Sequence, residues 1–232
     1  MEEVKIIFNI DECDAIAYLN DVEIGRCDYL EFGDYWNIVH TFVDPDYQGK
    51  GIAKMLVYSI IENADKNNKL LRADCGYAKR VIDKYRINTY LNQDIDNPKY
   101  LFHGSPKKLD KVSPQKSHDS NNTSINIDTA VFLFPSFIKS TAYAFKDKIK
   151  ENSEGLDWNF IIPNDNTLPL MIMENVFIDE DIIGYIYVFN NEEDIIKDKN
   201  SYQYKAYKEL KPIDIVEIKY SDYKDYYEVR GK

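Results

Sequence analysis

The sequence Gln48-Gly49-Lys50-Gly51-Ile52-Ala53 places two glycines and an amide side chain between a β-rich run and an apolar-periodic run. The first N–H groups of a helix have no intrahelical acceptor and carry positive partial charge, so a loop at that point can hold a phosphate without many cations. Gly49 and Gly51 permit close backbone approach, and the small Ala53 leaves room for a ligand. The pattern allows a phosphate-binding turn, although two glycines alone are more typical of an ordinary strand-to-helix turn.

The elements around this loop follow from hydrophobic periodicity and turn residues. Before the loop, β-rich runs separated by turn signals predict hairpin-linked strands at Val4–Ile10, Ala15–Leu19, Val22–Phe32 and Tyr35–Val43. After it, apolar residues at helical spacing predict an amphipathic helix from Ile52 to about Asp65. A further strand is expected at Leu70–Asp74 and a short helix at Tyr77–Tyr85.

The sequence from Arg86 to Lys99 loses this periodicity and is rich in Asn and Asp. We therefore expect a first domain at residues 1–88, a linker at 89–98 and a second domain at 99–232. The second domain contains a polar stretch, Ser113–Asp128, that is too long and hydrophilic for a packed connection and is expected to be mobile or functional. His118 lies within it and is expected to have no specific role.

The second domain is expected to be α+β with a strand-rich core. Its predicted elements are a strand at Ala130–Phe134, a helix from about Ser136 to Lys150, an apolar run at Leu168–Phe177, a strand at Gly184–Phe189 and a final strand at Ile213–Ile218. The fold class of the whole chain is therefore α+β with two domains.

Bulk composition limits the partners. The chain has 232 residues, 44% of them hydrophobic, and a formal net charge of -11, so its average surface repels nucleic-acid backbones and nucleic acid is expected only as a local substrate. Cys13, Cys27 and Cys75 are an odd number of cysteines at irregular spacing, which favours neither a disulfide framework nor a metal site. We find no leader or membrane-spanning pattern and expect a cytoplasmic protein without a membrane partner.

The pattern Q-x-x-G-x-A at Gln48–Ala53 resembles the acyl-CoA-binding signature of the GNAT N-acetyltransferases. The run IVHTFVDPDYQGKGIAKMLV and the later ADCGYAKRVIDKY are similar to the small, single-domain branch of that family, and the resemblance covers about Val4–Tyr85. It implies a mixed sheet with helices that binds acetyl-CoA. The pyrophosphate would lie on the backbone amides of residues 48–53, and the pantetheine would pair with the edge of the strand that ends at Val43.

The resemblance implies direct acyl transfer to a protein or small amine acceptor, in which an amine is deprotonated and held against the thioester. His40 could be the base, because its reference pKa is near neutrality, or a hydrogen-bonded structural residue. Cys75 could be a nucleophile, could hold the proton for the leaving thiol, or could be a small buried hydrophobe. Tyr77 could protonate the CoA thiolate or simply pack.

The second half carries another ordered set of residues. The sequence YLFHGS contains His103, Gly104 and Ser105, AVFLFPSFIKSTAYAF places Tyr143 on a helix after a strand, and a terminal strand pair follows. This order, over about residues 100–217, resembles the ADP-ribosyltransferase fold of the His-Tyr-Glu type. It implies a β-rich fold that binds NAD: His103 would contact the nicotinamide ribose, Gly104 the carboxamide through its backbone, with Ser105 beside it, and Tyr143 would stack on the ring.

The glutamate of that family is replaced here by Gln203. A glutamine can form hydrogen bonds but cannot stabilise developing positive charge as a carboxylate does, so either Glu209 serves instead or the catalytic activity is altered. Two alternatives stay open. The domain could be a divergent α+β fold with a core histidine and packed tyrosines, or the whole chain could be a non-enzymatic acidic protein that engages a partner protein.

Overall fold

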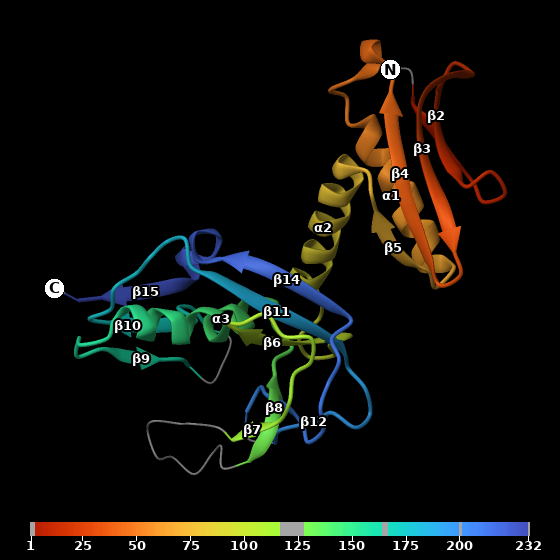
Figure 1. Ribbon diagram of the computed structural model, residues 1–232. Helices are drawn as coiled ribbons and strands as arrows, with labels where there is room; N and C mark the ends of the chain where they lie inside the picture. Colours follow the sequence, from red (N-terminus) through yellow and green to blue (C-terminus); the bar gives the residue numbers. More distant parts are fainter. Residues whose placement is uncertain (1–2, 117–127, 164–166, 200, 232) are drawn as a thin grey trace. The chain divides into compact units, whose positions relative to one another are not determined.

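The computed structural model describes residues 3–116, 128–163, 167–199 and 201–231 (Figure 1). The chain divides into two compact units, Met1–Thr89 and Tyr90–Lys232. Each unit has its own hydrophobic core and is described by itself.

The N-terminal unit is built on a mixed five-stranded sheet in the order β1-β2-β3-β4-β5. Strands β1 to β4 pair antiparallel as consecutive hairpins, and β5 joins the edge of β4 parallel to it. The bounds are β1 Lys5–Asn9, β2 Asp14–Leu19, β3 Val22–Phe32, β4 Tyr35–Val43 and β5 Leu70–Ala73. The predicted hairpin series and the strand after the helix are confirmed.

Helix α1 (Ile52–Lys66) packs along one face of this sheet, as Figure 1 shows. Its start at Ile52 is the predicted one, and its apolar stripe fills the core between helix and sheet. Gly25 on β3 makes this approach possible, because a Cβ there would lie 2.9 Å from the Phe42 carbonyl oxygen and 3.3 Å from Leu56 Cδ1. The helix start is therefore held tightly against the middle of the sheet.

Strand β4 contains a bulge that ends its pairing with β5. Asp28 pairs with His40 and Tyr29 with Ile38, so Val39 is an extra residue on β4. Strand β5 accompanies β4 only as far as Ile38, whose carbonyl oxygen accepts hydrogen bonds from the N–H groups of Asp74 and Cys75 at 3.0 and 3.1 Å. Beyond Ile38 the two strands separate, and the second half of β4 has an edge that β5 does not cover.

Helix α2 (Gly76–Leu91) is longer than the predicted helix at Tyr77–Tyr85, and it continues through Arg86, where the periodicity was lost, into the first residues of the linker expected at 89–98. The polar residues at the end of α2 show no helical periodicity, because contacts rather than local propensity stabilise the last turns of this helix. Arg86 Nη2 donates to the Leu71 carbonyl at 2.9 Å. Tyr90 is 7% exposed and donates its hydroxyl to Asp214 at 2.8 Å.

The C-terminal unit contains three small sheets, in the orders β14-β11-β6, β12-β13-β8-β7 and β15-β10-β9. The bounds are β6 Tyr100–Ser105, β7 Gln115–Lys116, β8 Thr129–Leu133, β9 Asn159–Ile161, β10 Met171–Glu174, β11 Ile183–Asn190, β12 Ile196–Lys197, β13 Tyr204–Ala206, β14 Asp214–Lys219 and β15 Tyr227–Arg230. Helix α3 (Phe137–Asn152) begins after Ser136, whose side-chain oxygen accepts from the Lys139 N–H as an N-cap.

The sheet of β6 and β11 is buried on both faces. Phe102, Ile186 and Val188 belong to the core that α3 covers, whereas the alternate residues Leu101 and Tyr187 belong to the core shared with β8 and β13. This two-sided burial explains why both strands read as continuous apolar runs.

The expectation that the strand near Ile218 is the last one is wrong. Strand β15 follows it and pairs parallel with β10. Tyr227 opens this strand, is 8% exposed, and its hydroxyl forms a hydrogen bond with Thr141 on α3. The sequence of β15 was not predicted to be a strand, because its aromatic and charged residues do not form a clear alternating pattern. Pairing with β10 rather than a local pattern stabilises this strand.

Candidate functional site

The loop before α1 is held closed by its own polar side chains. A short 3-10 helix, η1 (Pro45–Tyr47), begins with Asp44, whose carboxylate accepts from the Asp46 N–H at 3.0 Å. Gln48 then folds back, and its Nε2 donates to the Val43 carbonyl at 2.9 Å. The amide side chain that the sequence placed in the ligand loop thus has a structural task, which is to tie the loop to the end of β4.

The turn that follows presents a row of backbone N–H groups. Gly49 and Gly51 have φ angles of 77° and 81°, and Gly51 begins α1 without any side-chain cap. Within the described part of the chain, the N–H groups of residues 49–53 have no acceptor, and helical bonding starts with the donation of Lys54 and Met55 N–H to the Gly51 carbonyl. Alternating left-handed glycines and free amides form a concave anion-binding surface.

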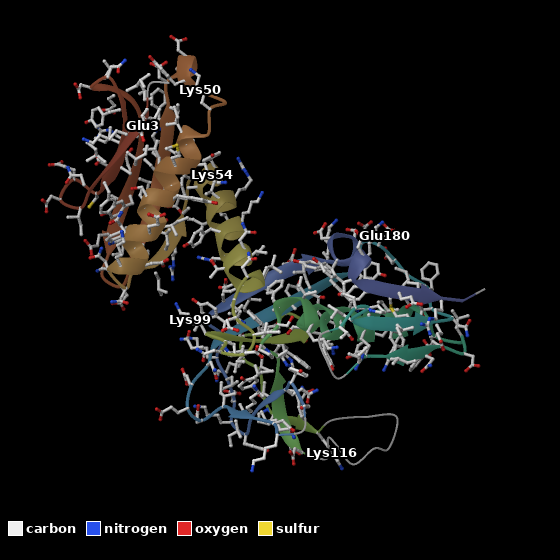
Figure 2. All side chains as sticks on the ribbon, turned by 180° about the vertical axis from the view of Figure 1, so that it is seen from behind. Glu3, Lys50, Lys54, Lys99, Lys116 and Glu180 are labelled. Atoms are coloured by element: carbon white, nitrogen blue, oxygen red, sulfur yellow. The ribbon has the colours of Figure 1, made fainter. Side chains whose placement is uncertain are left out.

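Lys50 adds a cation to this surface, at the tip of the loop beside the start of α1 (Figure 2). Its Nζ lies 3.4 Å from the Asp46 carbonyl oxygen and 4.9 Å from the centre of the Tyr47 ring. One lysine and several amides therefore supply positive potential at this turn against the nearby Asp44 and Asp46 carboxylates, and carboxylates beyond a Debye length of about 8 Å oppose it little.

The uncovered edge of β4 leads directly to this turn. The Asp44 N–H donates to the Ile24 carbonyl on β3 at 2.9 Å, so the antiparallel alternation directs the backbone groups of Phe42 and His40 toward β3. The backbone groups of Thr41 and Val43 therefore face the side that β5 does not cover, where the Thr41 N–H donates to Cys75 and the Val43 carbonyl accepts from Gln48. An extended ligand chain could pair with this edge while its phosphates lie on the turn.

His40 and Cys75 flank this edge from opposite faces of the sheet. His40 is exposed on the face without helices, across from Asp28. The neighbouring Thr41 points to the helix-covered face, where Cys75 Sγ lies 3.5 Å from its Oγ1. Tyr77, in the first turn of α2, is 37% exposed. The structure thus gathers the predicted residues around one strand edge without bringing His40 and Cys75 into contact.

The surroundings of Cys75 favour its ionised form. Burial alone would raise the pKa of the Cys75 thiol, but hydrogen bonds from the Ala78 N–H, the Thr41 hydroxyl, the Tyr77 N–H and the Thr41 N–H outweigh it and lower the pKa. Two of these donors are the first free N–H groups of α2. Sequence reasoning missed Thr41 and the buried Cys27 beside it, because only the register of β3 against β4 brings them together.

This geometry fits the similarity found by comparison. Residues 15–91 match the family model described as GCN5-related N-acetyl-transferase. The match supports a GNAT-type N-acetyltransferase domain at the N-terminus of this chain. No curated protein matches the sequence.

Solved structures of acetyltransferases show similarity over parts of the chain. The ribosomal-protein-alanine N-acetyltransferase of Brucella melitensis biovar Abortus 2308 is 19% identical over 32% of this chain and 62% of its own, with a TM-score of 0.26. Ard1 of Thermoplasma volcanium is 18% identical over 33% and 55%, with a TM-score of 0.29. Arabidopsis thaliana Naa50, in complex with the bisubstrate analogue CoA-Ac-MVNAL, is 20% identical over 34% and 64%, with a TM-score of 0.26. The chain thus spans 55% to 64% of the length of these proteins.

In the C-terminal unit, beyond the residues that the family model matches, His103 on β6 is half-buried beside β8. Its Nδ1 lies 2.9 Å from the Phe132 carbonyl oxygen, and its ring centre lies 6.2 Å from that of Tyr187. Burial lowers the pKa of His103 against the opposing effect of the carbonyl, so the ring is neutral near pH 7. A carbonyl only accepts, so Nδ1 carries the proton and Nε2 is left as an acceptor.

Gly104 is buried on β6, with its backbone groups on the edge away from β11. On this edge the Gln93 side-chain amide binds both backbone groups of Tyr100 at 3.0 Å, and Phe102 exchanges two 2.8 Å bonds with Phe134. The N–H and C=O of Gly104 point the same way and have no partner among the described residues. A Cβ at Gly104 would lie 2.0 Å from the Ser140 carbonyl oxygen of α3.

Tyr143 and Gln203 gather near the same short stretch of β8. Tyr143 stacks on Phe134 with ring centres 4.6 Å apart. Gln203 precedes Tyr204, which pairs with Leu133, and its Oε1 is buried without a hydrogen-bond partner in the described structure. Glu209, the other position considered, is instead paired with Lys111 at 2.7 Å. His103, Tyr143 and Gln203 thus surround the end of one strand.

Ser105 lies at the end of β6, 8% exposed, where its hydroxyl accepts from the Lys107 N–H. Much of the polar stretch predicted to be mobile or functional, residues 117–127 with His118, lies outside the described residues. In the parts that the structure does describe, no group of three or more His, Cys, Asp or Glu could hold a metal ion. No helix in these parts is both long and apolar enough to cross a membrane.

Proposed function

We propose that the N-terminal unit is an acetyl-CoA-dependent N-acetyltransferase. The observation that carries the proposal is the continuous path from the open edge of β4, beyond Ile38, to the free N–H groups of residues 49–53. Pantetheine, an extended amide chain, matches a strand edge, and a pyrophosphate matches the amide surface at the helix start. The GNAT family match over residues 15–91 supports the same ligand.

The reacting thioester would lie where β4 and β5 separate, between His40 and Cys75. Of the roles considered for Cys75, the nucleophile is favoured, because four hydrogen-bond donors stabilise its thiolate. Cys75 Sγ would attack the acetyl carbonyl and CoA would leave as its thiolate. The acceptor amine would then attack acetyl-Cys75, with its proton passing to His40 and the Cys75 thiolate leaving.

The acceptor is a protein or small amine. It would approach on the helix-free face, where His40 is exposed beside Asp28. Carboxylates on this face attract the ammonium form of an amine before His40 removes its proton.

Binding of acetyl-CoA tests the loop assignment with a matched pair of variants. Gly51→Glu places a carboxylate where the pyrophosphate would lie, and Gly33→Glu places one in the β3–β4 turn. Both glycines have positive φ angles, 81° and 55°, and open space around a Cβ. In calorimetric titrations of the full chain, Gly51→Glu should weaken binding at least about tenfold, and Gly33→Glu should bind as the wild type does. Equal affinity of both variants would reject the assignment.

A second candidate function, NAD-dependent ADP-ribosyl transfer by the C-terminal unit, is favoured by the backbone groups of Gly104. A peptide N–H and C=O that point away from the paired strand can pair with a planar carboxamide such as that of nicotinamide. The acceptor Nε2 of His103 and the unpartnered Oε1 of Gln203 could both receive hydrogen bonds from ribose hydroxyls. Gln203 lacks the carboxylate that would stabilise positive charge, so we propose NAD binding with slow or altered transfer.

Nicotinamide release separates these possibilities. The full chain is incubated with NAD, with and without candidate protein acceptors, and compared with His103→Ala and Gln203→Glu variants. The transferase would be supported if the wild type releases nicotinamide, the His103→Ala variant does not, and the Gln203→Glu variant releases it faster. If neither NAD binding nor release is detected, and acetyl-CoA is not turned over either, capture of one stoichiometric protein partner would favour the non-enzymatic acidic binding protein.

A further inference from the structure

One hydroxyl group lies between two sulfur atoms beside the open edge of β4. Thr41 Oγ1 is 3.3 Å from Cys27 Sγ and 3.5 Å from Cys75 Sγ. Cys27 and Thr41 are direct partners in the register of β3 and β4, so both side chains point to the helix-covered face. A hydroxyl has one proton to donate and lone pairs that accept. If it bonds both sulfurs and donates to one of them, it must accept from the other.

The direction follows from the environments of the two thiols. Cys27 is fully buried, and burial raises its pKa to about 12 despite the bond to Thr41. Its thiol therefore keeps its proton and can donate it to Thr41 Oγ1. In the described geometry the half-buried Cys75 thiol donates to Thr41 Oγ1. Once Cys75 is ionised it can only accept, and the Thr41 hydroxyl, whose lone pair is occupied by Cys27, then donates to the anion beside the Ala78 and Tyr77 N–H groups.

We propose that Cys27 and Thr41 are positioning residues that form a hydrogen-bond relay, Cys27 to Thr41 to Cys75, which holds the Cys75 sulfur as an oriented thiolate at the acyl-transfer position. The proposal rests on the acyl transfer proposed above and deepens it. It assigns a chemical task to Cys27, which touches no ligand, and to the hydroxyl of Thr41, whose backbone faces the pantetheine edge.

Other ionisable groups near Cys75 are few. Asp74 precedes it and is bound by the Asn37 side chain at 2.7 Å, and Tyr77 and Arg80 belong to the first turns of α2. From β4, His40 lies on the opposite face, and α1 contributes apolar side chains to the shared core. Of the described groups that donate to Cys75, the Thr41 hydroxyl is a side-chain donor, so a substitution can remove it without changing the backbone.

The relay can be measured without any acetyl transfer, because trypsin separates the three cysteines. Cleavage after Arg72 and Lys79 gives the peptide ADCGYAK with Cys75 alone, whereas Cys13 and Cys27 fall in other peptides. The full chain is alkylated with iodoacetamide across a pH series, and mass spectrometry follows this peptide. The midpoint of the rate against pH reports the ionisation of Cys75.

Thr41→Val should move this midpoint upward by about one pH unit, the size expected for one lost hydrogen bond to a charged sulfur. Thr41→Ser keeps the hydroxyl and should restore the wild-type midpoint. Cys27→Ala should also raise the midpoint, by less than about half of the Thr41→Val shift, because the Thr41 hydroxyl remains but no longer accepts a hydrogen bond from Cys27.

A midpoint unchanged in Thr41→Val, with a wild-type melting temperature, would overturn the relay and leave a packing role. If Thr41→Val does not fold, an unchanged midpoint in Cys27→Ala overturns it instead. The measurement is independent of the proposed function. Shifted midpoints in a chain that fails to bind acetyl-CoA would keep the relay and reject the acetyltransferase. Unchanged midpoints in a chain that binds acetyl-CoA would reject the relay and keep the acetyltransferase.

Discussion

Gln48 closes the loop at the start of α1 by donating its side-chain amide to the Val43 carbonyl at 2.9 Å. The bond occupies the last carbonyl of the open β4 edge and fixes where the strand edge ends and the amide surface of residues 49–53 begins. The resemblance placed Gln48 among the ligand-contacting residues, and the structure shows that its side chain shapes the loop.

Gln48→Ala should therefore weaken acetyl-CoA binding more than it weakens the fold. We expect about a tenfold loss of affinity, about 1.4 kcal/mol, and a fall in unfolding free energy of about 0.5–1.5 kcal/mol. Asn63→Ala is the matched control, because its side-chain amide also donates to a backbone carbonyl of this unit, that of Ser59 at 2.7 Å, but on α1. If both variants bind acetyl-CoA with the same affinity, the hydrogen bond from Gln48 to the Val43 carbonyl does not contribute to the binding site.

The acyl-enzyme route predicts a thioester on Cys75. The chain incubated with acetyl-CoA and no acceptor should give the peptide ADCGYAK carrying one acetyl group, which hydroxylamine removes. Cys75→Ser should lose this label and at least about 10²-fold of acetyl transfer, while its affinity for acetyl-CoA stays near that of the wild type. Transfer that proceeds in Cys75→Ala at the wild-type rate would instead support direct attack by the amine with His40 as base.

Local patterns in the sequence predicted most elements of the N-terminal unit. The bounds of β3 and β4 and the start of α1 at Ile52 agree with the structure, because hairpin turns and helical periodicity are local signals. The bulge at Val39 and the parting of β4 from β5 were not predicted. They depend on register across strands, and it is this register that brings Thr41 beside Cys75, 34 residues later.

The C-terminal unit was predicted less well for the same reason. Strand β15 pairs with β10 across a long separation in sequence, and α2 continues to Leu91 because the buried Tyr90 bonds Asp214. His103 and Gly104 were recognised from a short motif, but the sequence could not show that His103 bonds the Phe132 carbonyl or that Gly104 is buried against α3. These facts arise only when β6, β8 and α3 pack together.

His103 should make the stability of the C-terminal unit depend on pH. Desolvation lowers its folded pKa below the unfolded value of about 6.5. Above that value neither state is protonated. As the pH falls below it, the unfolded ring gains a proton that the folded ring does not, so unfolding becomes more favourable by up to about 1.4 kcal/mol per pH unit.

His103→Asn removes this contribution, so the stability advantage of the wild type should shrink from pH 7 to pH 5. Hydrogen exchange of peptides from β6 and β11 in a urea series measures the unfolding free energy at each pH, and peptides from α1 in the other unit are the internal control. A wild-type advantage that stays constant over this pH range would show that His103 is protonated equally in both states.

Gly104→Ala should prevent the C-terminal unit from folding correctly. An added Cβ would lie 2.0 Å from the Ser140 carbonyl oxygen and 2.7 Å from the Ala144 N, both backbone atoms of α3 that cannot move without displacing the helix. Overpacking of this kind costs at least about 1–3 kcal/mol. Gly155→Ala is the control, because its φ of 85° imposes backbone strain of about 1 kcal/mol but no atom lies within 4 Å of the new Cβ. Thermal melting should show a large loss for Gly104→Ala and a small one for Gly155→Ala. Similar small losses in both would mean that α3 does not lie against β6 as closely as these distances require.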